Sequence, residues 1–233
     1  MRKKWLEIKR KLFPKLITSK QYIEILKNRG IQIGVGTYFF SPDTTTIDMQ
    51  RPYLLTIGDY CKIAAGVKIL AHDYSRAVLR MAYGDIIGEA KETVIGKNVF
   101  IGIDAIILMG AHIGNNVIIG AGSVVSGNIP DNVVIAGNPA RIIRTLEEHY
   151  QIRKSKYVEE AKQMVRCMRE KGISPTIENM GAFFPIYLKR DQKEIVDHHL
   201  NINLNGDDTK DILTKFLESE PIYSSFEEFL KDC

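Results

Sequence analysis

Isoleucine or valine returns at every sixth position across residues 95–125 of this chain. The positions are Ile95, Ile101, Ile107, Ile113, Ile119 and Val125. Glycine follows the aliphatic residue at Gly96, Gly102, Gly114 and Gly120. An α-helix repeats its faces about every 3.6 residues and a β-strand every two, so a strict period of six fits neither element. Short periods of this kind are typical of parallel β-helices.

The period has a simple geometric explanation. If each hexapeptide is one short flat side and one turn, three of them close a triangular coil, and each first-position residue lies over the one eighteen positions later. β-Branched side chains pack well on such pleated surfaces, and Gly and Asn tolerate the dihedral angles of the corners. The fifth positions are mostly small, which indicates an inward corner with little room: Val99, Ala105, Ala111, Val117, Ser123 and then Ile129.

The repeat divides the chain into three parts. Its first traces are Ile33-Gly34 and the series Ile57, Ile63 and Ile69, after which the register breaks over residues 71–93 and returns at Ile95. We therefore predict an all-β core, a parallel β-helix over residues 31–144 with an excursion loop at about 71–93. Helical patterns predict an N-terminal helical segment over residues 1–30 and a C-terminal helical extension over residues 145–233.

The N-terminal segment is basic and carries one aromatic-aliphatic face. Trp5, Ile8, Leu12 and Leu16 recur at steps of three and four residues, and Glu7 is the only acidic residue among the first twenty. The favoured interpretation is a capping helix whose apolar face packs on the body of the protein. The alternative is a weak contact of residues 1–20 with an anionic membrane surface.

Composition excludes several classes of protein. The 233 residues carry a net charge of +4, without a stripe of Lys and Arg interleaved with aromatic residues, so we expect no nucleic-acid partner. No run of about eighteen apolar residues is present, and the first residues have no apolar core of a signal peptide. Cys61, Cys167 and Cys233 are widely spaced and show no pairing pattern, which suits a reducing, cytoplasmic location.

The wall of the predicted β-helix is nearly uncharged. Between Ile95 and Pro139 the only Asp, Glu, Lys or Arg residues are Lys97, Asp104 and Asp131. A surface this poor in charge indicates that part of it is covered, most simply by identical subunits.

Three features together resemble the hexapeptide-repeat acyltransferases, the family that includes galactoside, maltose and xenobiotic acetyltransferases. They are the six repeats, the sequence AHDYS before the excursion, and the ending IPDNVVIAGNPARIIR. The nearest branches O-acetylate capsular and cell-surface polysaccharides or acetylate xenobiotics. The resemblance implies a left-handed coil, a homotrimer, acetyl-CoA as the acyl donor, a saccharide or small-molecule acceptor, and no metal.

The family uses one histidine at the foot of the excursion, and His72 in AHDYS matches it. An acceptor hydroxyl must lose its proton as it attacks a thioester, and imidazole, with an ordinary pKa near ~6.5, can take that proton at neutral pH. The alternative is that His72 is a corner residue hydrogen-bonded to the backbone.

The resemblance also implies which residues hold the donor. The positions that match the contacts to the pantetheine arm are Gly102, Ile103, Ala121, Ser126 and Gly127, and Arg141 in AGNPAR matches a basic residue facing the nucleotide phosphates. Many members carry Lys where this chain has Gly127, so phosphate binding here is expected either to be weaker or to rest on Arg141 and Arg144.

The acceptor side departs from the family pattern. The galactoside and maltose enzymes have an Asn in the strand before the loop, and SPDTTTIDMQRPY contains none. Asp48 and Arg51 are the candidates for acceptor binding in its place. Alternatively, the two residues pair with each other as a structural salt bridge.

Three other functions fit parts of the pattern. A metal-dependent hydratase on the same fold needs two His ligands five residues apart, and here His112 is followed at that distance by Val117, so we reject it. Transfer to an amine of a nucleotide-sugar or an antibiotic is the enzymatic alternative. A non-catalytic β-helix that serves as an assembly platform is the non-enzymatic one.

Overall fold

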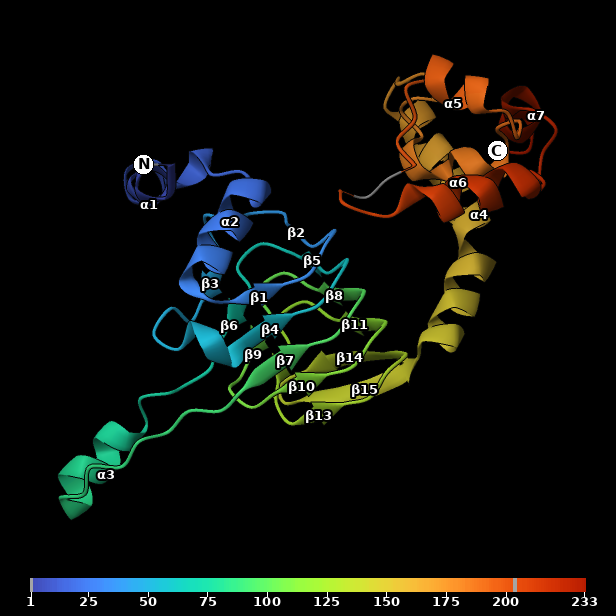
Figure 1. Cartoon of the computed structure of the whole chain (residues 1–233). Coiled ribbons are helices and arrows are strands. Elements are labelled where there is room, and N and C mark those ends of the chain that lie inside the picture. The colour runs from blue at the N-terminus through green and yellow to red at the C-terminus, as the bar shows by residue number, and fades with distance from the viewer. Residues whose placement is uncertain (1, 203–204) are drawn as a thin grey trace. The chain divides into compact units, whose positions relative to one another are not determined.

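Three parallel β-sheets form the walls of a coil in a computed structural model that describes residues 2–202 and 205–233 (Figure 1). Met1 and residues 203–204, which belong to the predicted terminal segments, lie outside the described residues. The chain passes from the first sheet to the second and then to the third before it returns to the first. We call the turns between them the first corner (first to second sheet), the second corner (second to third) and the third corner (third to first).

The strands are short, and each of the first four coils gives one strand to each sheet. The first sheet contains β1 (Gln32–Ile33), β4 (Leu55–Ile57), β7 (Thr93–Ile95), β10 (His112–Ile113) and β13 (Asn128–Ile129). The second contains β2 (Tyr38–Phe39), β5 (Lys62–Ile63), β8 (Val99–Ile101), β11 (Val117–Ile119), β14 (Val133–Gly137) and the antiparallel β15 (Ala140–Thr145). The third contains β3 (Thr46–Ile47), β6 (Lys68–Ile69), β9 (Ile106–Ile107) and β12 (Val124–Val125).

Aliphatic residues stack from coil to coil as the period of six predicts. The structure confirms three register pairs: Ile95 with Ile113, Ile101 with Ile119, and Ile107 with Val125. All six side chains are at most 3% exposed and belong to one hydrophobic core. Burying each of them contributes about 1.5–3 kcal/mol to folding, so the repeat itself supplies the core.

The assignment of Ile129 to the fifth position of its repeat is wrong. Ile129 pairs with Ile113 in the first sheet, sixteen residues away, so it occupies a first position. The last coil is therefore two residues shorter than the one before, and Ile135 likewise pairs with Ile119 sixteen residues away. The shortening takes place at the third corner, after Val125, where the strict six-residue spacing ends.

Glycine at the first corner allows successive coils to approach closely. A Cβ atom built on Gly96 would lie 2.6 Å from the backbone oxygen of Gly114 in the next coil. Gly58 and Gly114 face the neighbouring coil in the same way. A carbon atom cannot approach an oxygen atom to such distances without displacing the backbone. The close spacing of the coils therefore requires glycine at these positions.

Helix α2 (Ser19–Arg29) covers the first coil of the β-helix. It begins with a capping box formed by Thr18 and Gln21 and ends at Gly30, whose φ of 105° is accessible to glycine at little cost. Its buried Tyr22 packs edge-on against Phe39 of β2, with ring centroids 5.1 Å apart. This helix closes an end of the core that would otherwise expose aliphatic side chains.

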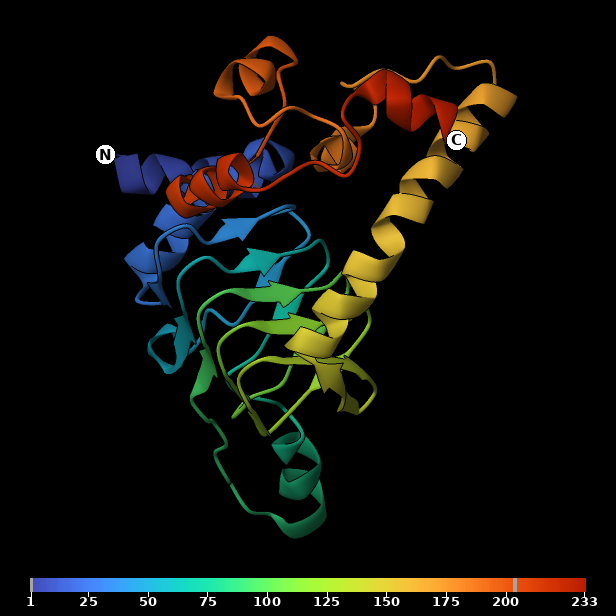
Figure 2. The same ribbon diagram turned by 90° about the vertical axis from the view of Figure 1, so that its right-hand side faces the viewer.

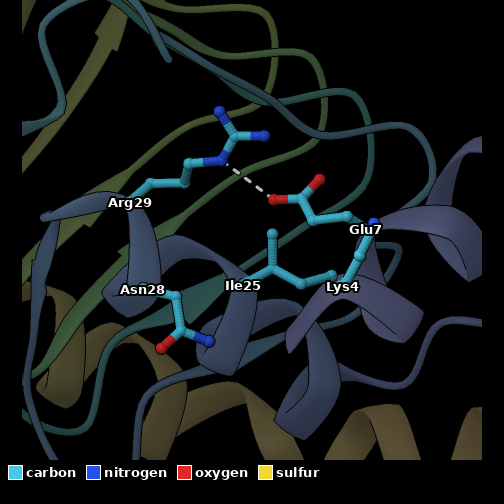
Figure 3. A pocket seen from close by; sticks show the side chains of 5 residues that line it. All are labelled: Lys4, Glu7, Ile25, Asn28 and Arg29. Carbon is cyan, nitrogen blue, oxygen red and sulfur yellow. Dashed lines mark hydrogen bonds and ion pairs between the residues drawn. The ribbon is translucent and has the colours of Figure 1, made fainter. Parts of the chain in front are cut away.

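Helix α1 (Arg2–Leu12) packs on α2 with a different side from the predicted one. Leu6 is 2% exposed, whereas Trp5, Ile8 and Leu12 are 55%, 48% and 66% exposed. Figure 3 shows Glu7 of α1 and Arg29 of α2 pointing toward each other, with 2.8 Å between Oε1 and Nε. The favoured interpretation, in which the aromatic-aliphatic face covers the body, is wrong because Leu6 and the ion pair turn that face outward.

The excursion between β6 and β7 carries helix α3 (Arg76–Tyr83) away from the coil (Figure 1). None of the residues of α3 is buried. Several of its large apolar side chains, and of those that follow it, are exposed: Val78, Met81, Tyr83 and Ile86. Gly84, with a φ of 75°, ends the helix.

The C-terminal unit, residues 149–233, has a hydrophobic core of its own. It includes most of helix α4 (Leu146–Glu170), drawn in yellow in Figure 2, followed by α5 (Gln192–Asp197), α6 (Thr209–Glu218) and α7 (Phe226–Lys231). Phe229 is fully buried and stacks on Tyr187, with ring centroids 5.2 Å apart. Among the helices in the described part of the chain, none combines the length and apolar character needed to cross a bilayer.

The glycine column gives a direct test of the coil spacing. We expect Gly96→Ala to lower the free energy of unfolding by about 1–3 kcal/mol, since its Cβ would overlap the backbone of Gly114. Gly88→Ala is the matched control, because no atom lies within 4 Å of a Cβ built there. Urea unfolding of both variants measures the difference. Equal stability of the two would show that the coils do not approach as described.

Candidate active site

The third corner gathers one residue from each coil in a line along the axis. Backbone hydrogen bonds run from Asp48 N to Ile69 O (2.9 Å), from Leu70 N to Ile107 O (3.0 Å) and from Leu108 N to Val125 O (2.9 Å). Asp48, Leu70, Leu108 and Ser126 therefore occupy equivalent positions. The excursion leaves the coil immediately after Leu70 and Ala71, so His72 lies at this corner as well.

His72 meets a carboxylate from the preceding coil. Its Nδ1 is hydrogen-bonded to Asp48 Oδ2. Asp48 also accepts the amide N–H groups of Gln50 at 2.9 Å and Ala71 at 3.1 Å. The side chains of His72 and Asp48 are only 10% and 2% exposed. Three hydrogen bonds to one buried carboxylate fix its position, and the histidine ring is fixed with it.

This contact determines which ring nitrogen of His72 can act as a base. An ionised carboxylate only accepts hydrogen bonds, so Nδ1 must donate, and in the neutral ring Nε2 then carries the free lone pair. Nε2 is buried and has no hydrogen-bond partner among the described residues. A buried polar nitrogen without a partner costs about 1–3 kcal/mol, and such a cost is typical of groups retained for chemistry.

Asp48 is held in its ionised form. Burial raises the pKa of Asp48, but the hydrogen bond from His72 and the two backbone amides outweigh burial, and the net pKa lies below its ordinary value. A carboxylate that stays charged keeps the Nδ1–H tautomer of His72 and would stabilise an imidazolium formed during proton transfer.

An aromatic side chain packs beside the His72 ring. Tyr74 lies edge-on to the His72 ring, with centroids 5.1 Å apart, and its hydroxyl is 2.5 Å from Gln50 Nε2. The Arg76 guanidinium lies over the Tyr74 ring, 5.2 Å from its centroid. Tyr74 is 58% exposed, so its ring lies between the buried His72–Asp48 pair and the solvent.

The positions matched to the acyl donor fall on two different corners. Gly102, Ile103 and Ala121 lie at the second corner, where a Cβ on Gly102 would be 2.6 Å from Ala121 N and Gly122 N donates to Ile103 O at 2.7 Å. Ser126 and Gly127 lie at the third corner, on the same edge as His72. The third sheet separates the two groups within one chain.

Two of the three arginines assigned to binding, Arg141 and Arg51, have no carboxylate partner among the described residues. Arg141 is exposed on β15 and donates from Nη1 to the Ala140 carbonyl at 2.9 Å. Arg51 precedes the short 3-10 helix Pro52–Leu54 and is half-buried. The proposed salt bridge between Asp48 and Arg51 is wrong, because the Asp48 carboxylate binds His72 and two amides instead.

Comparison with known proteins identifies the family. The model described as "Bacterial transferase hexapeptide (six repeats)" matches residues 92–127. Protein CapG of Staphylococcus aureus is 41% identical over 140 residues, covering 60% of this chain and 80% of CapG. The chain belongs to the hexapeptide-repeat transferase family.

Two further relatives of this hexapeptide-repeat transferase are named as O-acetyltransferases, both from Escherichia coli K12. The putative lipopolysaccharide biosynthesis O-acetyl transferase WbbJ is 52% identical over 125 residues, covering 48% of this chain and 62% of WbbJ. Galactoside O-acetyltransferase is 36% identical over 124 residues, covering 52% and 59% of the two chains. The hexapeptide-repeat protein is thus an acyltransferase, and the family membership supports the left-handed sense expected for its coil.

Sequence reasoning missed one pairing at the candidate site of this acyltransferase. It placed Asp48 at the acceptor, whereas the structure places Asp48 on His72, 24 residues later in the chain. The period of six gave no signal for this pairing, because Ile47 lies 22 residues before its register partner Ile69 instead of eighteen. Tyr74 and Gln50 carried no signal either, since their contact depends on how the excursion leaves the coil.

The charge on Asp48 should contribute to stability in a pH-dependent way. Because its folded-state pKa is lowered, the stabilisation is fully present above the unfolded value of about 3.9 and is lost as the pH falls below it. We expect Asp48→Asn to lose about 1–3 kcal/mol at pH 7 and to approach the original protein below about pH 4. Urea unfolding between pH 3 and 7 measures both, with the exposed Asp85→Asn as the control. A pH-independent difference would contradict the assignment.

Proposed function

We propose that this protein is an acetyl-CoA-dependent O-acetyltransferase that modifies a hydroxyl group of a saccharide. The observation that carries the proposal is the His72–Asp48 pair, in which Nδ1 is engaged by a buried carboxylate and Nε2 is left without a partner among the described residues. His72 is the general base and Asp48 is a positioning residue. Acetyl-CoA is a substrate in this scheme, and no step requires a metal.

The chemistry follows from the free lone pair on Nε2. His72 Nε2 takes the proton of the acceptor hydroxyl as its oxygen attacks the thioester carbonyl, and a tetrahedral intermediate forms. The imidazolium is stabilised by Asp48 while the carbon–sulfur bond breaks. The proton on Nε2 then passes to the departing thiolate, which leaves the products neutral and His72 ready for another cycle.

A homotrimer completes the donor site in this proposal. The second-corner residues Gly102 and Ile103 and the third-corner residue His72 do not meet in one chain, and a neighbouring copy can bring one corner opposite the other. Phe100 and Ile103 are 41% and 54% exposed on the uncharged wall, which favours such a contact. The apolar residues of α3 also fit a neighbouring subunit.

The choice of acceptor rests on the relatives and on the site. Galactoside O-acetyltransferase and WbbJ are named for transfer to oxygen, and the exposed Tyr74 ring beside His72 suits the apolar face of a sugar. The polysaccharide-modifying branch of the family is therefore the proposed context. A cytoplasmic location is part of the proposal, supported by the free thiols of Cys61, Cys167 and Cys233.

The acceptor class can be tested by the release of CoA. Purified protein with acetyl-CoA is incubated with a panel of sugars, nucleotide-sugars and aminoglycoside-like amines, and free thiol is measured. Turnover with sugar hydroxyls supports the proposal, and turnover with amines alone would show an N-acetyltransferase. No turnover and no stabilisation by CoA would favour an assembly platform.

Removal of the general base should abolish acyl transfer while the protein stays assembled. We expect His72→Ala to lower kcat and kcat/KM by about 10²–10⁴, and His72→Asn to behave alike because an amide cannot take up the proton. Sedimentation equilibrium should still give a trimer, and the exposed His199→Ala serves as the control. Retention of more than about a tenth of the activity would make His72 structural.

Arg141 should act on the donor rather than on the chemical step. We expect Arg141→Ala to raise the KM for acetyl-CoA about tenfold with a smaller change in kcat, as for loss of a charged hydrogen bond in uniform binding. CoA at a hundredfold its Kd should stabilise the original protein by about 2.7 kcal/mol, and Arg141→Ala should need more CoA for the same shift. Arg153→Ala, in the C-terminal unit, is the control. An unchanged KM would place the phosphates elsewhere.

A further inference from the structure

The outward side of α1 is a continuous apolar stripe. At about 100° per residue, Ile8, Leu12 and Trp5 lie roughly 200–260° around the helix from the buried Leu6. The stripe continues into the turn that follows, where Phe13 and Leu16 are 57% and 61% exposed. All five side chains are about half exposed or more.

Lysines flank the stripe on both sides. Lys4 and Lys11 lie roughly 140–160° from Leu6 around the helix and Lys9 at about 300°, so the apolar stripe lies between them. Lys4, Lys11 and Lys15 are exposed. The Lys9 ammonium lies 5.5 Å from the Trp5 ring centroid.

The only acidic side chain of α1 does not cancel this charge. Glu7 is bound by Arg29 at 2.8 Å (Figure 3). It also lies 4.0 Å from Arg10. These contacts, led by the Arg29 hydrogen bond, hold the pKa of Glu7 below its ordinary value. The same ion pair, the buried Leu6 and a hydrogen bond from Lys9 to Gln21 at 3.0 Å fix the orientation of α1 on α2. The stripe therefore stays directed away from the β-helix.

We propose that α1 and the turn after it, residues 2–16, bind an anionic membrane surface, with the helix lying in the plane of the interface. A helix with an apolar stripe flanked by lysines matches such a surface in both chemistry and charge. A second copy of this chain is a poorer occupant, because a symmetric contact would place Lys4 and Lys11 of one copy against the same lysines of the other. The proposal does not depend on the identity of the acceptor.

The single tryptophan of the chain, Trp5, reports directly on this contact. The full-length protein is mixed with vesicles of phosphatidylcholine alone or with added phosphatidylglycerol. We expect a blue shift of the Trp5 emission and co-sedimentation with the anionic vesicles only, both weakened by salt. Binding of equal strength to neutral vesicles, or no shift with anionic ones, would overturn the proposal.

Two sets of variants separate the apolar and the charged contributions. Ile8→Glu with Leu12→Glu should abolish vesicle binding, whereas Ile173→Glu, at a residue as exposed as Ile8 (both 48%), should not. Replacing Lys4, Lys11 and Lys15 by Gln should weaken binding about a hundredfold, at roughly fivefold per lysine. The same replacement at Lys156, Lys171 and Lys193 is the control.

Two further measurements keep the alternatives apart. Acyl transfer to a soluble acceptor without vesicles should be unchanged in the Ile8→Glu, Leu12→Glu protein, since neither residue touches the His72 site. Sedimentation equilibrium of that protein should give the same oligomer as the original chain. A smaller oligomer would identify a second copy as the occupant of the stripe and would overturn the membrane assignment.

Discussion

Coil-on-coil stacking of aliphatic side chains is the constraint on which the rest of this structure depends. The first four coils are held to one another by parallel hydrogen bonds on three walls and by buried columns such as Ile69, Ile107 and Val125. A residue can be added or removed only at a corner, because a change inside a strand would turn the aliphatic residues outward. The shortened last coil and the long excursion both obey this rule.

The stacking also explains how two residues far apart in sequence form a hydrogen-bonded pair. Asp48 and His72 come from successive coils and meet at one corner, because Ile47 and Ile69 occupy one column. The rigid coil fixes the carboxylate through the amides of Gln50 and Ala71. In the proposed mechanism, a base held in this way needs little reorganisation when it accepts a proton, which is the usual advantage of a preorganised site.

The ends of a β-helix need protection, because a terminal coil exposes both its core and unpaired strand edges. Helix α2 covers the first coil through Tyr22 and Phe39, and the antiparallel β15 pairs with β14 at the other end of the second sheet. With α2 in this role, α1 is not required as a cover. Its apolar side is therefore available for another surface, which is the basis of the proposed membrane contact.

The sequence by itself determined the β-helix, its strand columns and the position of His72. These features are local, so the period of six and the motif AHDYS indicate them, apart from the column that Ile129 occupies. The short spacing from Val125 to Ile129 could not be read from the period. Ile129 fits either the fifth or the first position of a repeat until its partner Ile113 is known.

Only the tertiary structure decided the partner of Asp48 and the orientation of α1. A carboxylate near an arginine in sequence suggests a salt bridge, but the fold places the backbone amides and the imidazole closer to Asp48 than Arg51. Periodicity likewise shows that α1 has an apolar side and cannot show which side faces the protein. The buried Leu6 and the Glu7–Arg29 ion pair fix which side of α1 faces the protein. Their energies depend on contacts between α1 and other elements, and the sequence pattern does not contain those contacts.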